Sequence, residues 1–344
     1  MSDITDKEIG VGSEHSAGYA PDDRAAGRRR KRRVWRVARW SLGSLLGLVI
    51  VTVAGSYAYV NHVASSIPRI HVAYLVPASG TSQTFLFTAD PLAPTAAGDQ
   101  AAAQSSESNA IMLLHFDANG KGGAVVTIPG DTVVNVPGVG TKPLWDAFET
   151  GGASLLVRTV SQLTGVPINH YARVDFSHIT SLVNAIGGVD VTLPDTTKSF
   201  GYTFHAGVNH LTGVNAIYYA RDPSLSDEDR LLRQEVLIRA ILTKIADDHL
   251  VTNPVTVVRV LNAITSTLTV DSNLTNSGIE SLTRKFGTLG SSAATFVTAP
   301  TKTVKGKLVL NTAIADPLWT AIKHDSIAGF AATYPSTVTP LVAP

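Results

Sequence analysis

An uncharged apolar run, Ser41–Val60, constrains this chain more than any other part of its sequence (SLGSLLGLVIVTVAGSYAYV). Its length is close to the ~20 residues that an α-helix needs to cross a bilayer. Trp40 precedes the run and Tyr59 lies near its far end, as in the aromatic belts at the two membrane surfaces. We therefore expect a transmembrane helix over residues 40–61, followed by a domain that folds outside the membrane.

The basic cluster Arg28–Arg33 (RRRKRR) lies just before the apolar run. Lysine and arginine beside a membrane helix stay on the cytoplasmic side. We therefore expect residues 1–39 to form a disordered, basic cytoplasmic tail of a single-pass cell-membrane protein whose C-terminal domain is extracellular. A cleaved signal peptide is the alternative, because the small residues Ala64-Ser65-Ser66 follow the run. The juxtamembrane position already explains the cluster, so no nucleic-acid partner is expected.

The chain has no cysteine. It therefore has no disulfide, no thiolate nucleophile and no cysteine metal site, and its exported part of about 280 residues must be stabilised by its own core. Strand and helix patterns alternate, which predicts an α/β fold: a single layered domain with a mixed central β-sheet flanked by helices. We expect residues 62–83 to be an extracellular linker and first strand, 84–325 the domain itself, and 326–344 a C-terminal tail.

Local patterns favour that fold class. Ala110–Asp117 is an almost continuous apolar run, typical of a buried strand, and Asn119-Gly120 turns the chain toward a second strand, Ala124–Ile128. Leu211–Arg221 has a helical pattern. Asp227–Ile245 has apolar residues at three-to-four spacing and acidic residues in its first turn, which suits the positive end of the helix dipole. The last segment is expected to be a long amphipathic helix.

Arginines are grouped around the start of that helix, in Tyr219–Gln234 (YARDPSLSDEDRLLRQ). They are Arg221, Arg230 and Arg233. A guanidinium fork matches phosphate oxygens two at a time. This group can therefore bind a phosphate or pyrophosphate.

Taken in order, these segments resemble the LytR-CpsA-Psr family of bacterial cell-wall transferases. The resemblance covers roughly residues 80–325 and is strongest in Leu155–Ala172 (LLVRTVSQLTGVPINHYA), Gly187–Leu193 (GGVDVTL) and Ala206–Gln234. It implies an enzyme that takes a polymer from a polyprenyl-pyrophosphate carrier and joins it to peptidoglycan by a phosphodiester bond, with Mg²⁺ as cofactor and an apolar tunnel for the prenyl tail. The implied partners are the polyprenyl-pyrophosphate-linked glycopolymer, peptidoglycan and the membrane.

The resemblance also implies a metal site. Asp90, in the segment Thr84–Pro91 (TFLFTADP), matches a magnesium-binding aspartate of the family, whereas Asn109 stands where the family has a second one. An amide oxygen can ligate Mg²⁺ but brings no charge. Because magnesium binds mainly through carboxylates and substrate phosphates, we expect weakened Mg²⁺ binding.

By the same resemblance, Arg221, Arg230 and Asp131 are the candidate catalytic residues. The two arginines would neutralise the pyrophosphate, and Asp131 would take the proton of the acceptor hydroxyl. Arg221, Arg230, Arg233 and Gln234 are the candidate substrate-binding residues.

The chain departs from the family at two further positions, because Gly130 and Pro223 stand where the family has arginines. Phosphoryl transfer depends largely on positioning and charge stabilisation. With fewer charged site residues than the family has, the chain leaves an alternative from a different functional class. It would be a degenerate member, weakly active or inactive, that binds a polyprenyl-phosphate lipid or assists an active paralogue. A structural wall-anchoring protein without an apolar tunnel is a third possibility.

Purely structural roles stay open for several of these residues. Asp227 can cap its helix, and Arg233 can pair with Glu228 or Asp229 at helical spacing. Asp131 can be an ordinary turn residue.

Other chemistries lack a motif. His115 and His170 lie within strands and are expected to be structural. Ten scattered histidines without an HExxH pattern do not predict a zinc site. The chain has no Gly-x-Ser-x-Gly elbow and no P-loop, so the sequence gives no support to a serine hydrolase or a nucleotidase.

Overall fold

The computed structural model describes residues 61–78, 80–90, 110–120, 122–175, 179–247, 259–260, 262–263, 265, 267–279, 281–282 and 294–344. Among these residues, no helix is both long enough and apolar enough to cross a membrane. The expected transmembrane helix over 40–61 lies, except for Asn61, outside the described ranges. The cytoplasmic tail over 1–39 lies outside them as well, so both stay predictions.

A mixed β-sheet forms the centre of the unit Ala58–Pro344. Over the described residues it has seven strands, with parallel pairing of β2 with β7 and of β4 with β13, and antiparallel pairing of β2 with β3 and of β3 with β4. The mixed sheet agrees with the expected fold class. In sheet order the strands are β1 (Arg69–Ile70), β12 (Leu268–Asp271), β7 (His170–Asp175), β2 (Gln83–Asp90), β3 (Ala110–Phe116), β4 (Gly123–Pro129) and β13 (Ala294–Thr298).

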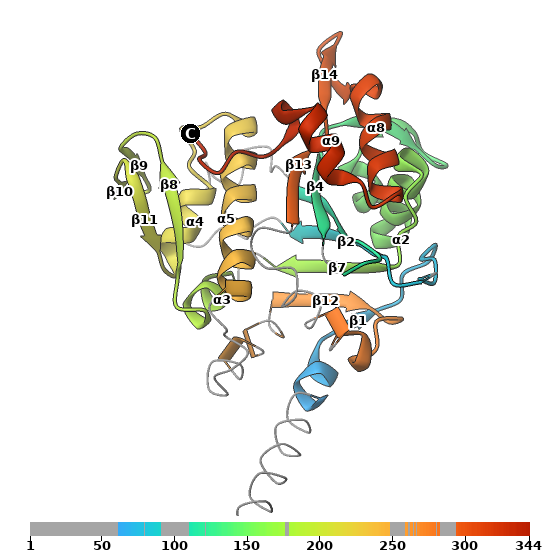
Figure 1. Ribbon diagram of the computed structural model, residues 1–344, viewed down its shortest axis with the longest axis horizontal. Coiled ribbons are helices and arrows are strands. Elements are labelled where there is room, and N and C mark those ends of the chain that lie inside the picture. Colours follow the sequence, from blue (N-terminus) through green and yellow to red (C-terminus); the bar gives the residue numbers. More distant parts are fainter. Residues whose placement is uncertain are drawn as a thin grey trace, which may run out of the picture. The chain divides into compact units, whose positions relative to one another are not determined.

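Alternating apolar residues give this sheet two buried faces. Phe85 and Met112 belong to one hydrophobic core, and their chain neighbours Leu86 and Leu113 belong to the other. Helices cover both faces, so the domain has three layers (Figure 1). The first core contains α3 (Ile179–Ala185), α4 (Val214–Ala220) and α5 (Asp227–Asp247), and the second contains α2 (Trp145–Thr164), α8 (Thr312–Lys323) and α9 (Ile327–Thr333).

Four two-stranded ribbons complete the described elements. One of them changes the expected helix Leu211–Arg221, which begins only at Val214 because Gly207–Leu211 pairs with the strand Val189–Leu193. The ribbons are β5 (Val133–Val136) with β6 (Gly140–Pro143), β8 (Val189–Leu193) with β11 (Gly207–Leu211), β9 (Thr197–Ser199) with β10 (Tyr202–Phe204), and β14 (Thr301–Val304) with β15 (Lys307–Leu310).

Residues 326–344, expected as a C-terminal tail, fold onto the domain. They contain α9 and a short 3-10 helix, η3 (Pro335–Thr337). Val338 makes a β-bridge to Val297 of β13, and Val342 makes one to Thr192 of β8. This segment therefore connects the central sheet to the β8–β11 ribbon.

Glu235 of α5 is a buried carboxylate at the centre of these contacts. The hydroxyls of Thr298 and Thr339 donate hydrogen bonds to it, at 3.0 and 2.6 Å, and Thr127 makes a third. Burial raises its pKa above 4.5, although these hydrogen bonds and the positive charge of Arg239 work in the opposite direction. The folded domain therefore holds a carboxyl group that would bind a proton more tightly than it does in the unfolded chain.

Replacing Glu235 by Gln is expected to stabilise the domain at neutral and alkaline pH. A raised pKa in the folded state means that stability falls as pH rises from the ordinary value through the raised one. The uncharged amide removes that fall, so the melting temperature should rise by about 2–4 °C, or on the order of 1 kcal/mol, near pH 8. The gain should vanish at about pH 4, below the ordinary pKa.

Thermal unfolding of the purified chain at both pH values measures this effect. Glu149→Gln is the matched control, because Glu149 is exposed on α2. A gain of equal size at both pH values, or a loss near pH 8, would contradict the assignment.

Candidate functional site

The carboxyl ends of four strands meet at one edge of the central sheet. Strands β2, β7, β4 and β13 all run in the same direction, because β3 is antiparallel to both β2 and β4. Asp90, the last residue of β2, lies in register with Asp175, the last residue of β7. At the same edge β3 begins at Ala110, opposite Pro129, the last residue of β4. The chain thus brings several polar residues from distant segments to one side of the sheet.

One of the two expected metal ligands lies at this edge of the sheet. Asp90 ends β2, whereas Asn109 directly precedes Ala110 and lies outside the described residues. Asp175 supplies a second carboxylate at the edge, on the strand next to β2. Carboxylate and amide oxygens are the protein ligands that Mg²⁺ prefers, so the donor types gathered here fit that ion.

Asp131 follows β4 in a tight turn. The amide of Thr132 donates to Pro129 O at 3.0 Å, and the amide of Trp145 donates to Gly130 O at 3.0 Å. These bonds fold the β5–β6 ribbon and the start of α2 back against the turn. Asp131 is exposed, whereas Gly130 is buried. The carboxylate of Asp131 is therefore accessible from solvent at the sheet edge.

The arginines come from the junction of α4 and α5. Arg221 is the C-cap residue of α4 and is half-buried. Arg230 lies in the first turns of α5, also half-buried, with Nη1 donating to Leu225 O at 3.4 Å. Gln234 lies one turn further along α5 and is half-buried as well. Arg221 and Arg230 thus lie on either side of the α4–α5 junction.

Ser226 supplies the described capping contacts at the start of α5. Its hydroxyl oxygen accepts a hydrogen bond from the amide of Asp229 at 3.1 Å, and the hydroxyl donates to the Asp229 carboxylate at 2.8 Å. This is a reciprocal cap of the helix N-terminus. Ser226 thus caps the helix N-terminus, and the hypothesis that Asp227 caps it stays a hypothesis.

Arg233 is buried inside the junction and is only 1% exposed. Its Nη1 donates to Asp222 Oδ2 at 3.1 Å and to Tyr219 O at 3.4 Å, and its Nε donates to Pro344 O. Its carboxylate partner is thus Asp222, in place of Glu228 or Asp229. Asp222 also accepts two hydrogen bonds from Ser224. Arg233 therefore organises the loop that carries Arg221.

Two contacts place the start of α5 near the sheet edge. Glu235 bonds to Thr298 at the end of β13, and Arg239, one turn later, lies 4.4 Å from the ring of Phe296. The helix therefore runs antiparallel to β13, and Figure 1 shows the two elements side by side. Arg230 precedes Glu235 by about 7.5 Å of helix, so it lies beyond the carboxyl end of β13.

Two buried hydroxyls beside the candidate residues have no hydrogen-bond partner among the described residues. They belong to Thr132, which follows Asp131, and to Tyr219, which precedes Arg221 by two positions. Burial raises the pKa of the Tyr219 phenol, despite the positive charge of Arg233, so this hydroxyl stays protonated. Both groups lie next to residues of the candidate site and can bond to water or ligand.

Sequence patterns did not predict two charged residues that lie at this edge of the sheet. Arg173 and Asp175 both lie on β7, and Arg173 lies in register with Thr88 of β2. The available signal was that the segment Tyr171–Asp175 (YARVD) contains two charged residues, one of them at its end. Their proximity to Asp90 depends on the pairing of β2 with β7, which strand patterns do not predict.

His170 has the structural role that the sequence predicts. Its Nδ1 lies 3.1 Å from Asp271 Oδ2, and the same oxygen accepts the amide of Tyr171. Asp271 is fully buried. This pair ties β7 to β12.

Comparison with known proteins gives a family match over most of the domain. Residues 79–323 match the LytR_cpsA_psr family. The chain is 33% identical over 161 residues to the polyisoprenyl-teichoic acid–peptidoglycan teichoic acid transferase TagU of Enterococcus faecalis, covering 45% of this chain and 53% of that protein. It is 32% identical over 164 residues to the probable cell wall biosynthesis protein LcpB of Corynebacterium glutamicum, covering 46% of this chain and 39% of the relative. The matches thus span about half or less of these curated relatives.

Solved structures show the same fold. The LytR-Csp2A-Psr enzyme from Actinomyces oris superimposes with a TM-score of 0.57 at 18% identity, covering 74% of this chain and 95% of that one. The layers, the mixed sheet and the matched residues lead to the same conclusion: this chain belongs to the LytR_cpsA_psr family.

Proposed function

We propose that this protein transfers a cell-wall glycopolymer from a polyprenyl-pyrophosphate carrier to peptidoglycan by forming a phosphodiester bond. Family membership and the similarity to the teichoic acid transferase of E. faecalis support the reaction class. The observation that carries the proposal is the convergence of Asp90, Asp131 and the α4–α5 junction at one edge of the sheet. Carboxylates and arginines at one place are what pyrophosphate chemistry requires.

Arg221 and Arg230 are the groups that bind the pyrophosphate. Both guanidinium groups come from the ends of helices whose junction is fixed by buried contacts, so they are positioned before the substrate binds. Such preorganised positive charge stabilises the negative charge of phosphoryl transfer without a further reorganisation cost. Arg233 acts through Asp222 by holding the loop, and Gln234 extends the polar surface along α5.

Asp90 and Asn109 would hold a Mg²⁺ ion, and Asp175 lies in register with Asp90. A bound ion would supply positive charge that offsets the charge of the phosphate oxygens. The exposed Asp131 accepts the proton of the acceptor hydroxyl on peptidoglycan, since a general base needs access to the incoming group. The acceptor oxygen then forms the new bond to phosphorus while the carrier phosphate leaves.

The proposed location follows from the sequence of residues 40–61. A membrane helix there would hold the domain at the outer surface of the cell membrane, where a lipid carrier and peptidoglycan are both within reach. The basic cluster would keep the N-terminus in the cytoplasm.

Lipid binding without turnover is the second candidate function. Gly130 is buried beneath the Trp145 amide, and Pro223 lies in the loop next to Asp222, so neither position supplies a cation. The full-length chain, purified in mild detergent and mixed with Mg²⁺, a polyprenyl-pyrophosphate-linked saccharide and peptidoglycan, separates the two functions. Mass spectrometry of bound lipid and of the glycan product gives both readouts. Bound lipid without product would favour the second function, and neither lipid nor product would refute both.

Removing one pyrophosphate-binding arginine is expected to abolish most of the turnover. Arg221→Ala and Arg230→Ala should each lower the rate by about a hundredfold to a thousandfold, as expected for a lost transition-state contact. Arg158→Ala is the matched control, because Arg158 lies on α2, with its guanidinium 5.2 Å from the ring of Tyr74. The assignment would be overturned if neither substitution lowered the transfer rate below that of wild type at the same substrate concentration.

Asp222→Asn should lower the stability of the domain, whereas Asp131→Asn should lower turnover and leave stability unchanged. Loss of the Asp222 charge leaves the buried Arg233 without its ion-pair partner, so the domain should lose about 3–5 kcal/mol of stability. Asp131→Asn changes an exposed carboxylate, so the melting temperature should stay the same while turnover falls. Denaturant unfolding together with the transfer assay measures both effects. A stable Asp222→Asn protein would show that the buried pair is not what holds the junction.

A further inference from the structure

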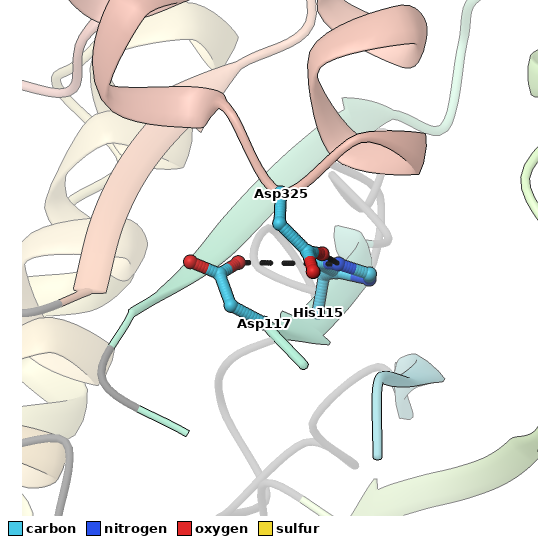
Figure 2. A group of neighbouring side chains, drawn as sticks. All are labelled: His115, Asp117 and Asp325. Atoms are coloured by element: carbon cyan, nitrogen blue, oxygen red, sulfur yellow. Dashed lines mark hydrogen bonds and ion pairs between the residues drawn. The ribbon is translucent and has the colours of Figure 1, made fainter. Parts of the chain in front are cut away.

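A second polar cluster lies away from the sheet edge described above. His115 is on β3 and Asp117 directly follows that strand, whereas Asp325 lies between α8 and α9. His115 Nε2 is 2.8 Å from Asp325 Oδ1 and 4.0 Å from Asp117 Oδ1. Figure 2 shows the imidazole and both carboxylates pointing toward one another.

The cluster is separate from the candidate transferase site. Strand β3 begins at Ala110, at the edge that holds Asp90, and His115 is near its other end. His115 shares the sheet face of Ile111 and Leu113, whose core contains α2, α8 and α9. The two groups of residues therefore lie at opposite ends of one strand.

Asp117 has a buried oxygen that the described residues leave without a hydrogen bond. The residue is only 6% exposed, and its Oδ1 has no hydrogen-bond partner among the described residues. A Cβ atom at Gly122 would lie 2.3 Å from the other oxygen, Oδ2, so the neighbouring turn leaves space only for the carboxylate. Burying a carboxylate oxygen without a hydrogen-bond donor costs free energy. The position of Asp117 Oδ1 facing His115 therefore requires an explanation.

The histidine is oriented like a metal ligand. Its Nδ1 lies 2.9 Å from the hydroxyl of Thr84, which leaves Nε2 directed at the two aspartates. Metal-binding imidazoles commonly use their second nitrogen in such a bond, which fixes the ring and its tautomer. With Nδ1 protonated, Nε2 and the facing carboxylates are all acceptors, and a cation between them satisfies all three.

The electrostatics favour a cation as well. The two carboxylates face one imidazole and concentrate negative charge in a largely buried place. A divalent ion removes both the repulsion and the unpaired oxygen.

We propose that His115, Asp117 and Asp325 bind a divalent first-row transition-metal ion such as Zn²⁺. The three ligand atoms lie within 4.8 Å of one another. Zinc–nitrogen and zinc–oxygen bonds of about 2.0–2.2 Å place tetrahedral ligands roughly 3.4 Å apart, so small side-chain rotations close the site. The imidazole favours zinc over magnesium, which prefers oxygen ligands.

The ion fastens the α8–α9 junction to the turn between β3 and β4. Asp325 already reaches this turn, because its Oδ2 accepts the amide of Ala118 at 2.9 Å. Its side chain is 26% exposed, which gives an entering ion access and leaves a position for water. The proposed role is structural, and it does not depend on the transferase activity.

Ordinary His–Asp pairing does not account for the cluster. His210 and Asp190 form such a pair at 2.7 Å on the surface, and His170 and Asp271 form a buried one at 3.1 Å. Each of those pairs has one carboxylate. In the described part of the chain, only the cluster at His115 has three ligating groups close enough to share an ion.

Zinc binding by the full-length chain tests the proposal. The protein is purified in detergent without a histidine tag, stripped with a chelator, and titrated with Zn²⁺ in competition with a chromophoric zinc chelator. Thermal unfolding with and without Zn²⁺ is measured in parallel. We expect one bound zinc ion per chain and a melting temperature that rises with zinc concentration.

Variants identify the ligands. Asp117→Asn and Asp325→Asn should each weaken zinc binding by more than tenfold, and Thr84→Val should weaken it by about tenfold to a hundredfold through the second nitrogen of His115. Asp117→Asn keeps the shape of the side chain and removes an unpaired buried charge, so the zinc-free variant should remain folded. If Thr84, His115 and the two aspartates only stabilised the fold, Thr84→Val would leave the zinc affinity unchanged.

Two controls separate this site from others. His210→Asn changes the exposed His–Asp pair, and Asp90→Asn changes the expected Mg²⁺ site, and both should leave zinc binding unchanged. The proposal is overturned if the wild-type chain binds no zinc, or if Asp117→Asn and Asp325→Asn bind it as tightly as wild type. Loss of binding in either control would overturn it as well.

Discussion

The buried ion pair between Arg233 and Asp222 is the contact on which the rest of the candidate site depends. Arg233 has the largest fully buried side chain of the described residues, and its guanidinium joins α5 to the carbonyl of Tyr219 near the end of α4 and to Pro344. A buried charge is tolerated only when its hydrogen bonds are satisfied. The α4–α5 loop must therefore close in one way, and that closure sets where Arg221 and Arg230 lie.

The central sheet keeps two kinds of polar chemistry apart. At the carboxyl end of β4, the chain enters a turn in which Asp131 is exposed to solvent. At the other end of β3, His115 and Asp117 are buried beneath the α8–α9 junction. Exposure suits binding and transfer of large substrates, whereas burial suits a fixed ion. Strand β3 thus runs from the edge that holds the candidate transferase site to the buried cluster of His115 and Asp117.

Much of the fold could be predicted from local patterns, because period and burial are properties of neighbouring residues. The helix expected over Asp227–Ile245 is α5, Asp227–Asp247, and the strand expected over Ala110–Asp117 is β3. The helix expected over Leu211–Arg221 was too long, since pairing with β8 draws Gly207–Leu211 into a ribbon. Pairing between distant segments overrides local propensity there, and no window of sequence contains that information.

Sequence patterns predicted the family, the α/β class and the positions of Arg221 and Arg230 beside the start of a helix, because each of these depends on residues close together in the chain. Only the tertiary structure decided that Arg233 serves the scaffold and that Asp175 accompanies Asp90. It also brought Asp325 to His115 across a separation of 210 residues. Such contacts are fixed by strand order and helix docking, which together leave little buried charge unpaired. They join segments far apart in the chain, so no repeating pattern in the sequence predicts them.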